Sequence, residues 1–190
     1  MKKPLAAVFL MIWSACGHHA WGADAPAVQS QTGKPFAVKI VPANSVPAKI
    51  PAIRWEDSNF KGEFHVVLVN LTDKAQLVFA RGSSWGDGAL RLRITLSSGK
   101  TSDIIYRGIY SRNVPTPYLI PKGGEMVYPI VLNRQWREKP DFTRLEDRKI
   151  KLQAVYEVVP SPESKQAGIW TGTIVSAPLT VEIDLTDYDD

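Results

Sequence analysis

The feature that most constrains the fold is a strict alternation of apolar and polar side chains between residues 90 and 96. Leu90, Leu92, Ile94 and Leu96 alternate with Arg91, Arg93 and Thr95. Successive side chains of a β-strand point to opposite faces of a sheet, so this pattern predicts a strand with one face in a core and the other in water. The turn residues 97–100, followed by the apolar Ile104 and Tyr106, predict that the strand turns back into a hairpin.

The same period recurs in many short segments. The alternating segments are 36–41, 64–69, 77–79, 126–132, 150–158, 169–175 and 179–185. After residue 22, no window shows the i, i+3, i+4, i+7 stripe of an amphipathic helix. We therefore expect an all-β domain, an antiparallel sandwich of about seven to nine strands. Val67 and Val69 add an apolar second face to segment 64–69, which predicts a strand buried on more than one side.

Prolines mark the places where pairing is expected to stop, because proline donates no backbone hydrogen bond and is confined to sheet edges and bulges. The prolines that carry this argument are Pro42, Pro47 and Pro51 after the first strand, and Pro129 within a later one. They predict an edge or extended crossover at the first place and an edge or bulge at the second. Segment 111–122, with three further prolines, is expected to be irregular.

The first 22 residues have the layout of a secretory signal peptide. Lys2 and Lys3 form a positive start, residues 4–15 are uncharged and mostly apolar, and small residues stand at the −3 and −1 positions of a cut before Ala23. As a helix this apolar run rises only about 18 Å, too short to span a bilayer comfortably. Residues 23–35 are interpreted as a flexible tether and residues 36–190 as a single domain. The expected location is the periplasm or the exterior of a bacterial cell.

Cys16 offers a second processing route. Residues 13–17, Trp-Ser-Ala-Cys-Gly, resemble a bacterial lipobox, in which Cys16 would be lipidated and become the mature N-terminus. Trp13 departs from that pattern, which has leucine or another aliphatic residue at this position. The sequence leaves cleavage before Ala23 and lipidation at Cys16 both open, and neither route leaves a free thiol in the folded domain.

Composition and charge narrow the classes of partner. The chain is 44% hydrophobic and 22% charged, which excludes a disordered, highly charged chain. Without residues 1–22, 21 basic and 19 acidic side chains remain, a net charge of +2. Because no cluster of Lys and Arg is interleaved with aromatic residues, no nucleic-acid partner is expected. A single cysteine supplies neither a disulfide framework nor a thiolate metal cluster.

The sequence after residue 22 offers no catalytic constellation. His65 is its one histidine, and it contains no Gly-x-Ser-x-Gly elbow and no cysteine that could act as a nucleophile. The acidic C-terminus lacks the glycine of a calcium loop, and the Gly-rich residues 83–88 lack the lysine of a phosphate loop. We therefore expect no enzyme activity, no metal and no cofactor. His65 is expected to be a sheet residue that is satisfied locally.

Aromatic side chains are the remaining candidates for binding. Trp85 and Trp136 fall in predicted loops, Arg134 lies close to Trp136, and Tyr118 lies in the proline-rich segment. Loops over a rigid sandwich concentrate binding function, and exposed Trp and Arg dominate interaction hot spots. Trp85, Trp136, Tyr118 and Arg134 are therefore the candidate binding residues. Packing of a loop tryptophan back over the sheet edge is the alternative.

Three arginines supply a second candidate surface. Arg91, Arg93 and Arg107 fall on the polar face of the predicted hairpin, where guanidinium groups could meet a carboxylated or phosphorylated partner. A solvated outer face explains the same residues, and that is the interpretation we favour.

Several short motifs resemble immunoglobulin-like modules of bacterial exported proteins. Residues 151–156 (Lys-Leu-Gln-Ala-Val-Tyr), 170–172 and 179–181 resemble the end of such modules, while 67–70 and 121–125 resemble an early strand and a turn before a mid-domain strand. The resemblance spans about residues 60–185. It implies a sandwich in which Tyr156 is buried and its hydroxyl bonds to the backbone. The cysteines of antibody-type domains are missing, so only the sandwich carries over.

Together these features predict a non-enzymatic exported module that binds an unknown protein or glycan through the loops around Trp85, residues 111–122 and Trp136. One alternative is a carbohydrate-binding module, in which Trp85, Tyr118 and Trp136 form a flat exposed row that stacks on sugar rings. Another is an enzyme, or a protease inhibitor that holds residues 115–121 rigid and exposed. Membrane contact is expected only through a lipid on Cys16.

Overall fold

Strands dominate the structure. The computed structural model describes residues 34–43, 51–56, 59–111, 113–132, 135–138, 140 and 148–184. The strands within these ranges are β1 (Phe36–Pro42), β2 (Ala52–Glu56), β3 (Asn59–Asn70), β4 (Gln76–Phe79), β5 (Leu90–Leu96), β6 (Thr101–Tyr106), β7 (Pro117–Ile120), β8 (Glu125–Leu132), β9 (Trp136–Arg137), β10 (Lys149–Val158), β11 (Gly172–Val175) and β12 (Leu179–Asp184). Two five-residue helices accompany them, α1 (Ser84–Gly88) and α2 (Pro162–Gln166). The all-β prediction is confirmed. The strands outnumber the seven to nine expected because several, such as β9, are too short to show an alternation.

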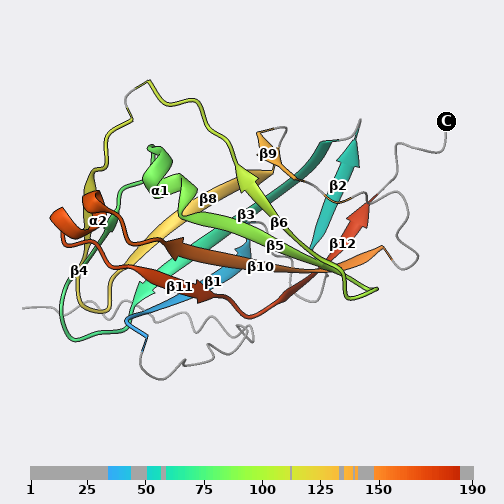
Figure 1. Cartoon of the computed structure of the whole chain (residues 1–190). Coiled ribbons are helices and arrows are strands. Elements are labelled where there is room, and N and C mark those ends of the chain that lie inside the picture. The colour runs from blue at the N-terminus through green and yellow to red at the C-terminus, as the bar shows by residue number, and fades with distance from the viewer. Residues whose placement is uncertain are drawn as a thin grey trace, which may run out of the picture.

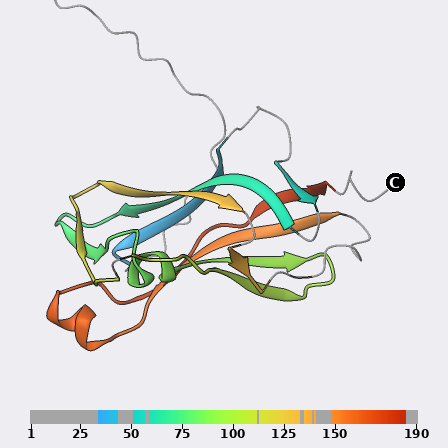
Figure 2. The same cartoon turned by 90° about the horizontal axis from the view of Figure 1, so that it is seen from above.

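The strands form two layers that lie over one another (Figures 1 and 2). In the first layer, β3 pairs antiparallel with β1 at one edge and with β8 at the other. In the second, β10 pairs with β5 at one edge and with β11 and β12 at the other, and β5 continues to β6 and β9. β4 and β7 pair only with each other among the described strands.

The long strand β3 belongs to both layers. Its first residues pair with β2, which runs parallel to β12, and Ile53 lies opposite Ile183 in that parallel pair. This pair departs from the purely antiparallel sheet that we expected. Because β3 continues from this junction into the pairing with β1 and β8, one unbroken strand joins the two layers.

The predicted hairpin is present as β5 and β6, with Leu92 opposite Ile104. Gly99 has a φ of 83°, a left-handed conformation that glycine adopts at no steric cost. The turn is closed by hydrogen bonds from the Leu96 N–H to the Lys100 carbonyl and from the Gly99 N–H to the Leu96 carbonyl, both 2.9 Å. The turn residues and the strand alternation therefore both predicted this hairpin correctly.

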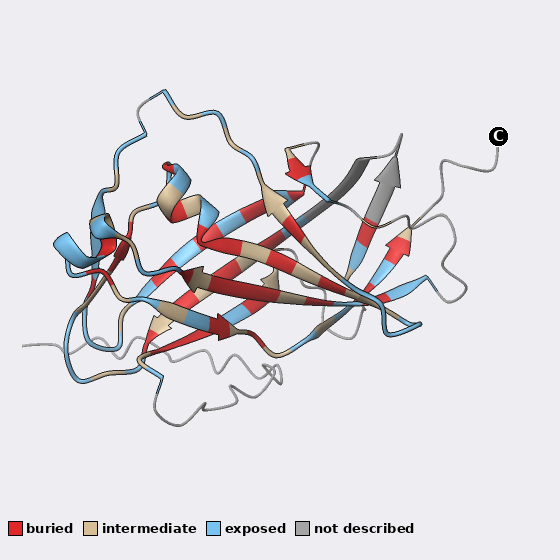
Figure 3. Ribbon diagram, viewed as in Figure 1, coloured by how far each residue is buried: buried red, intermediate tan, exposed pale blue. Residues whose placement is uncertain are grey.

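One hydrophobic core fills the space between the layers, and its residues appear as red bands that alternate along β8 (Figure 3). Tyr156 on β10 is fully buried, and its ring stacks on Trp170 with centroids 6.2 Å apart. Trp170 is half-buried and packs against the core. The expectation that both rings serve the core therefore agrees with their positions.

The Tyr156 hydroxyl does not make the backbone hydrogen bond that the resemblance implied. It is fully buried, and the Tyr128 hydroxyl is a polar neighbour, but no hydrogen bond of ordinary length and angle joins it to a described residue. The ring lies between Trp170 and Tyr128, whose ring centroid is 6.2 Å away, and this packing holds the hydroxyl inside the core. Burial disfavours the charged phenolate and raises the pKa of Tyr156 to about 12.

The expectation that β3 is buried on more than one side is met only in part. Val66 and Leu68 have no exposed area, whereas Val67 and Val69 are only half-buried. Even-numbered residues of this part of β3 point into the core, and odd-numbered residues point to the outer face of the first layer. The apolar second face in the sequence is therefore an outer surface.

Prolines do mark open edges, as predicted. The Asn70 N–H donates to the Gly124 carbonyl, so even-numbered residues of β8 bond to β3 and Pro129 turns its missing donor to the open side. The same reasoning places Pro42 on the open side of β1 and Pro117 on that of β7. Segment 111–122 is consequently less irregular than expected, because Pro117 does not prevent β7 from pairing with β4.

Candidate binding cleft

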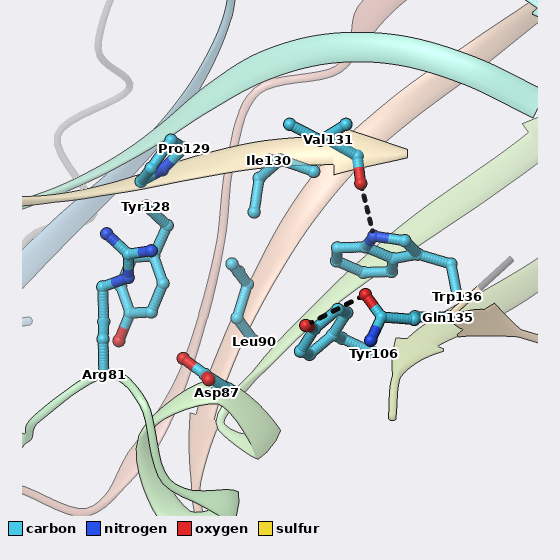
Figure 4. Close-up of a pocket in the computed structure, with 10 residues that line it drawn as sticks. All are labelled: Arg81, Asp87, Leu90, Tyr106, Tyr128, Pro129, Ile130, Val131, Gln135 and Trp136. Carbon is cyan, nitrogen blue, oxygen red and sulfur yellow. Dashed lines mark hydrogen bonds between the residues drawn. The ribbon is translucent and has the colours of Figure 1, made fainter. Parts of the chain in front are cut away.

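A cleft of about 250 Å³ lies at the open side of the two layers, between β8 and the strands β5, β6 and β9 (Figure 4). Arg81 and Asp87 lie at one end, and Tyr106, Gln135 and Trp136 lie at the other. The residues that line it are Arg81, Asp87, Leu90, Tyr106, Tyr128, Pro129, Ile130, Val131, Gln135 and Trp136. Apolar walls with a few polar groups are typical of ligand sites in proteins.

Trp136 and Tyr106 form the aromatic end of the cleft. Their ring centroids are 5.5 Å apart, and the planes are tilted by 55°. Trp136 Nε1 donates to the Val131 carbonyl at 3.2 Å, and the Tyr106 hydroxyl donates to Gln135 Oε1 at 3.3 Å. The short strand β9 thus ties Trp136 to the edge of β8, and only 3% of this side chain is exposed.

Arg81 closes the opposite end. Its guanidinium carbon lies 5.3 Å from the centre of the Tyr128 ring, a cation–π distance, and its NH1 donates to the Val127 carbonyl at 3.0 Å. Tyr128 is almost fully buried, and its hydroxyl approaches the Gly86 carbonyl at 3.5 Å. Burial raises the pKa of Tyr128 well above its ordinary value, so the phenol stays protonated.

The helix α1 positions Asp87. Ser83 caps the helix by accepting a hydrogen bond from the Gly86 N–H at 3.2 Å, as serine does at many helix starts. A side chain at Gly86 would place its Cβ 1.8 Å from the Ala80 carbonyl oxygen, so only glycine fits this close approach. Both carboxylate oxygens of Asp87 accept from the Gly82 N–H at 3.2 Å. Asp87 is consequently held at the cleft by local backbone contacts.

The loop that leaves β6 is fastened to α1. The Ser84 N–H donates to Asn113 Oδ1 at 2.8 Å. Burial, and then the nearby Asp87 carboxylate, raises the pKa of Tyr110 to about 12. The loop is therefore held near α1 and Asp87, and its Ile109 and Val114 side chains are 95% and 60% exposed.

The residues selected from the sequence do not all lie where they were expected. Trp136 is buried in a strand instead of exposed in a loop, because its indole packs on Tyr106 and caps the β8 edge. Trp85 is a half-buried residue of α1 that packs against the core. Tyr118 is 45% exposed on β7. An exposed row of all three rings is therefore not present.

Two of the selected residues, Arg134 and Cys16, lie outside the described residues. Of the selected residues that the structure describes, only Trp136 lines the cleft. Tyr106 and Tyr128 were recognised only as strand residues, and Arg81 and Asp87 were not singled out. These four side chains come together only because distant segments of the chain pair, and no local pattern in the sequence predicts that proximity.

The arginine face is an ion-pair network. Asp103 on β6 accepts from Arg91 Nε at 2.8 Å and from Arg93 Nε at 2.7 Å, and Arg91 NH1 also pairs with Glu157. Hydrogen bonds from Arg93 and Arg91 hold the pKa of Asp103 and of Glu157 below their ordinary values, and Asp103 in turn raises the pKa of Arg93. The arginines on β5 are thus committed to carboxylates of this chain, which agrees with a solvated outer face.

Within the described ranges, no three His, Cys, Asp or Glu side chains lie close enough together to hold a metal ion. His65 is half-buried on the outer face of β3. No helix of the part that the structure describes is long and apolar enough to cross a membrane.

Comparisons with known proteins leave the family open. No family model matches the chain, and no curated protein is significantly similar to it. One solved structure with structural similarity carries the description "X-ray structure of Northeast Structural Genomics Consortium target SoR45". The match has 13% sequence identity, covers 78% of this chain and 86% of that chain, and has a TM-score of 0.41. A likeness of this degree establishes neither a shared family nor a shared function.

Proposed function

We propose that this chain is a non-enzymatic binding module that takes one large apolar or aromatic side chain of a partner protein into the cleft. The observation that carries the proposal is the aromatic cleft of about 250 Å³ beside a loop with exposed apolar side chains. Pockets lined by Trp, Tyr and Arg are typical of interaction hot spots.

The size of the cleft favours a single anchor. Small-molecule sites usually have volumes of about 300–1,000 Å³, so this cleft falls just below that range and suits one side chain or a fragment of similar size. Leu90, Ile130 and the rings of Tyr106 and Tyr128 supply apolar contact, and Arg81 and Asp87 supply polar contacts at one end. A partner side chain would therefore bury its apolar body while the peptide backbone meets the charged end.

The surrounding loop extends the contact surface. Ile109 and Val114 lie on the segment that arches above α1 in Figure 1, and both side chains are largely exposed. Large apolar side chains exposed together near a pocket mark interaction surfaces. This surface contains part of the segment 111–122 that the sequence indicated.

The backbone groups at the open edge of β8 favour recognition of a partner's side chain over pairing with a partner's β-strand. Pro129 offers no N–H on the open side, and the carbonyls of Val127 and Val131 already accept from Arg81 and Trp136. A strand added here would find few of the backbone groups that give such complexes their affinity. Recognition in this cleft therefore depends on side chains.

We further propose that the two layers form an immunoglobulin-like sandwich and that the module is exported. The buried Tyr156 ring and the packed β1–β3–β8 layer support the first point. The positive start, apolar run and small residues before Ala23 support the second. The intact mass of the exported protein tests it. A chain that begins at Ala23 or at a lipidated Cys16 agrees with export, and a retained Met1 contradicts it.

A random-peptide display selection tests the binding function. We expect the selected peptides to share one aromatic or large aliphatic residue, and we expect Tyr106→Ala and Arg81→Glu to weaken binding at least about tenfold, the effect of losing one hot-spot contact. Val159→Ala is the matched control, because Val159 is 68% exposed and does not line the cleft.

Three outcomes contradict this function. They are a selection that yields no binding peptide, selected peptides without a common anchor, and binding that survives both cleft substitutions. A parallel glycan panel covers the carbohydrate alternative. Glycan binding that Tyr106→Ala abolishes, in the absence of peptide binding, would replace the proposal with that alternative.

A further inference from the structure

The outer face of the first layer has valines along its centre and the exposed charged residues Lys39, Glu63 and Glu125 at its margins, while its Ala37 is buried. The register of β1, β3 and β8 places their odd-numbered side chains in rows across this face: Ala37, Val69 and Glu125; Lys39, Val67 and Val127; Val41, His65 and Pro129. Val131 follows beside Glu63. We call these residues the valine face. Val127 and Val131 are 38% and 55% exposed, and Val67 and Val69 are half-buried among their neighbours.

An apolar outer face of this kind is unusual for an antiparallel layer. Such layers commonly bury one face and present a polar face to water. No described helix or strand lies over the valine face in Figure 2. Contiguous exposed apolar side chains with charged groups around them mark protein–protein contacts. The valine face therefore has the character of an interface that this chain does not cover by itself within the described ranges.

We propose that a second copy of this chain covers the valine face, in a symmetric dimer whose two-fold axis runs along β3. This axis places β1 of one copy over β8 of the other and places Val67 over its own counterpart. Packed sheets lie about 10 Å apart, so the valines of the two faces interdigitate. Two-fold symmetry is the commonest arrangement of protein dimers and uses the same patch on both copies.

Charge complementarity favours a second copy over an unrelated partner. Under this axis, Lys39 of one copy lies over the row of Val127 in the other, one row from Glu125. One row is two residues, about 7 Å along the strand, which the long Lys39 side chain can span. Symmetry makes the contact twice, on either side of the central valines. The same axis brings the Glu63 carboxylates of the two copies together at one end of the face, and their repulsion limits the strength of the dimer. Neither Lys39 nor Glu125 forms an ion pair with a residue that the structure describes.

The small area of the valine face limits the expected affinity of the dimer. Three strands about 4.8 Å apart and four rows about 7 Å apart give a face of about 400 Å², about half of the roughly 800 Å² per partner that stable complexes usually bury. We therefore expect a reversible dimer. Sedimentation velocity of the full chain from about 1 μM to about 1 mM, a range that covers weak dissociation constants, measures it directly.

Substitution of Val127 tests the location of the interface. Val127→Lys places an ammonium group in the proposed interface and is expected to weaken the dimer at least about tenfold. The matched control is Val159→Lys, the same change at an exposed valine outside the face, which should leave the dimer intact. Circular dichroism and thermal unfolding of both variants show whether the fold is preserved.

A charge exchange tests the orientation. Lys39→Glu should weaken the dimer by placing like charges together, and adding Glu125→Lys in the same chain should restore it. A wild-type chain that stays monomeric over the whole range overturns the proposal. A dimer that withstands Val127→Lys, or a charge exchange that restores nothing, overturns it as well. The cleft function does not depend on these outcomes, because the peptide selection measures it separately.

Discussion

The two outer faces of this molecule are built from the same strand alternation and have opposite character. On the second layer, outward residues of β5, β6 and β10 form a network of Arg91, Asp103 and Glu157. On the first layer, the outward residues are those of the valine face. Both layers bury the alternate side chains in one core. The alternation therefore decides which side chains face inward, while the identity of the outward residues decides whether a face meets water or another molecule.

The largest expected loss of stability is at Leu68, which faces the core, in comparison with its neighbour Val67, which faces outward. Leu68→Ala should lower the free energy of unfolding by about 2–5 kcal/mol, because it leaves a cavity in the core. Val67→Thr keeps the branched shape that strands favour and should cost less than about 1 kcal/mol in dilute solution. Urea unfolding measures both. Equal losses would mean that the valine face is as tightly packed as the core, which would remove the contrast between the faces.

The network on the other face is expected to contribute less. Asp103→Asn removes the charge that Arg91 and Arg93 share and should lower the free energy of unfolding by about 1 kcal/mol, as partly exposed ion pairs do. The loss should shrink in high salt, because salt screens partly exposed charges. Unfolding of wild type and variant at low and high sodium chloride measures this. A loss that does not change with salt would show that packing, not charge, is what Asp103 supplies.

Low pH should remove the stabilisation that the ion pairs of Asp103 and Glu157 provide. The pKa values of Asp103 and Glu157 are lower in the folded state than their ordinary values, so their stabilisation is complete at neutral pH. It is lost as the pH falls below about 4 and both carboxylates take up protons. The difference between wild type and Asp103→Asn should therefore disappear in acid. A difference that persists at pH 2 would rule out the carboxylate charge as its source.

The smallest effect is expected in the interior that both faces share. Tyr156→Phe removes a buried hydroxyl that has no partner among the described residues, so stability should change by less than about 0.5 kcal/mol or increase slightly. Thermal unfolding is the measurement, and Tyr128→Phe is the comparison, because that hydroxyl approaches the Gly86 carbonyl. A loss of more than about 1 kcal/mol in Tyr156→Phe would point to a hydrogen bond that the hydroxyl makes in solution.

The sequence predicted what local chemistry decides. The alternation from Leu90 to Leu96 and the turn at Gly99 identified the hairpin, and Pro129 identified an edge, because each of these features acts within a few residues. The helix α2 lies between the alternating segments 150–158 and 169–175, where we expected no helix from the sequence. Its signal was present, since Ser161 caps the helix and Pro162 occupies its first turn.

The cleft was not predictable in the same way. Tyr106, Tyr128 and Trp136 come from three strands that only the pairing of distant segments brings together. The assignment of Trp136 to a loop was wrong because β9 has two residues, too few for an alternation to show. The alternative, packing of its ring over the sheet edge, is what the structure has. Val67 and Val69 show a related limit. An apolar second face in the sequence does not tell whether the strand is covered by the same chain, is covered by another molecule or forms an outer surface.

The parallel pair of β2 and β12 has a consequence for how the protein is made. Ala52 lies opposite Glu182, so an early strand remains without this neighbour until the last described strand has been synthesised. Contacts between segments so far apart slow folding and prolong the time during which unpaired strands are exposed. During synthesis, β2 therefore waits longest for its final neighbour, and a molecular chaperone that holds unpaired strands would have most to protect there.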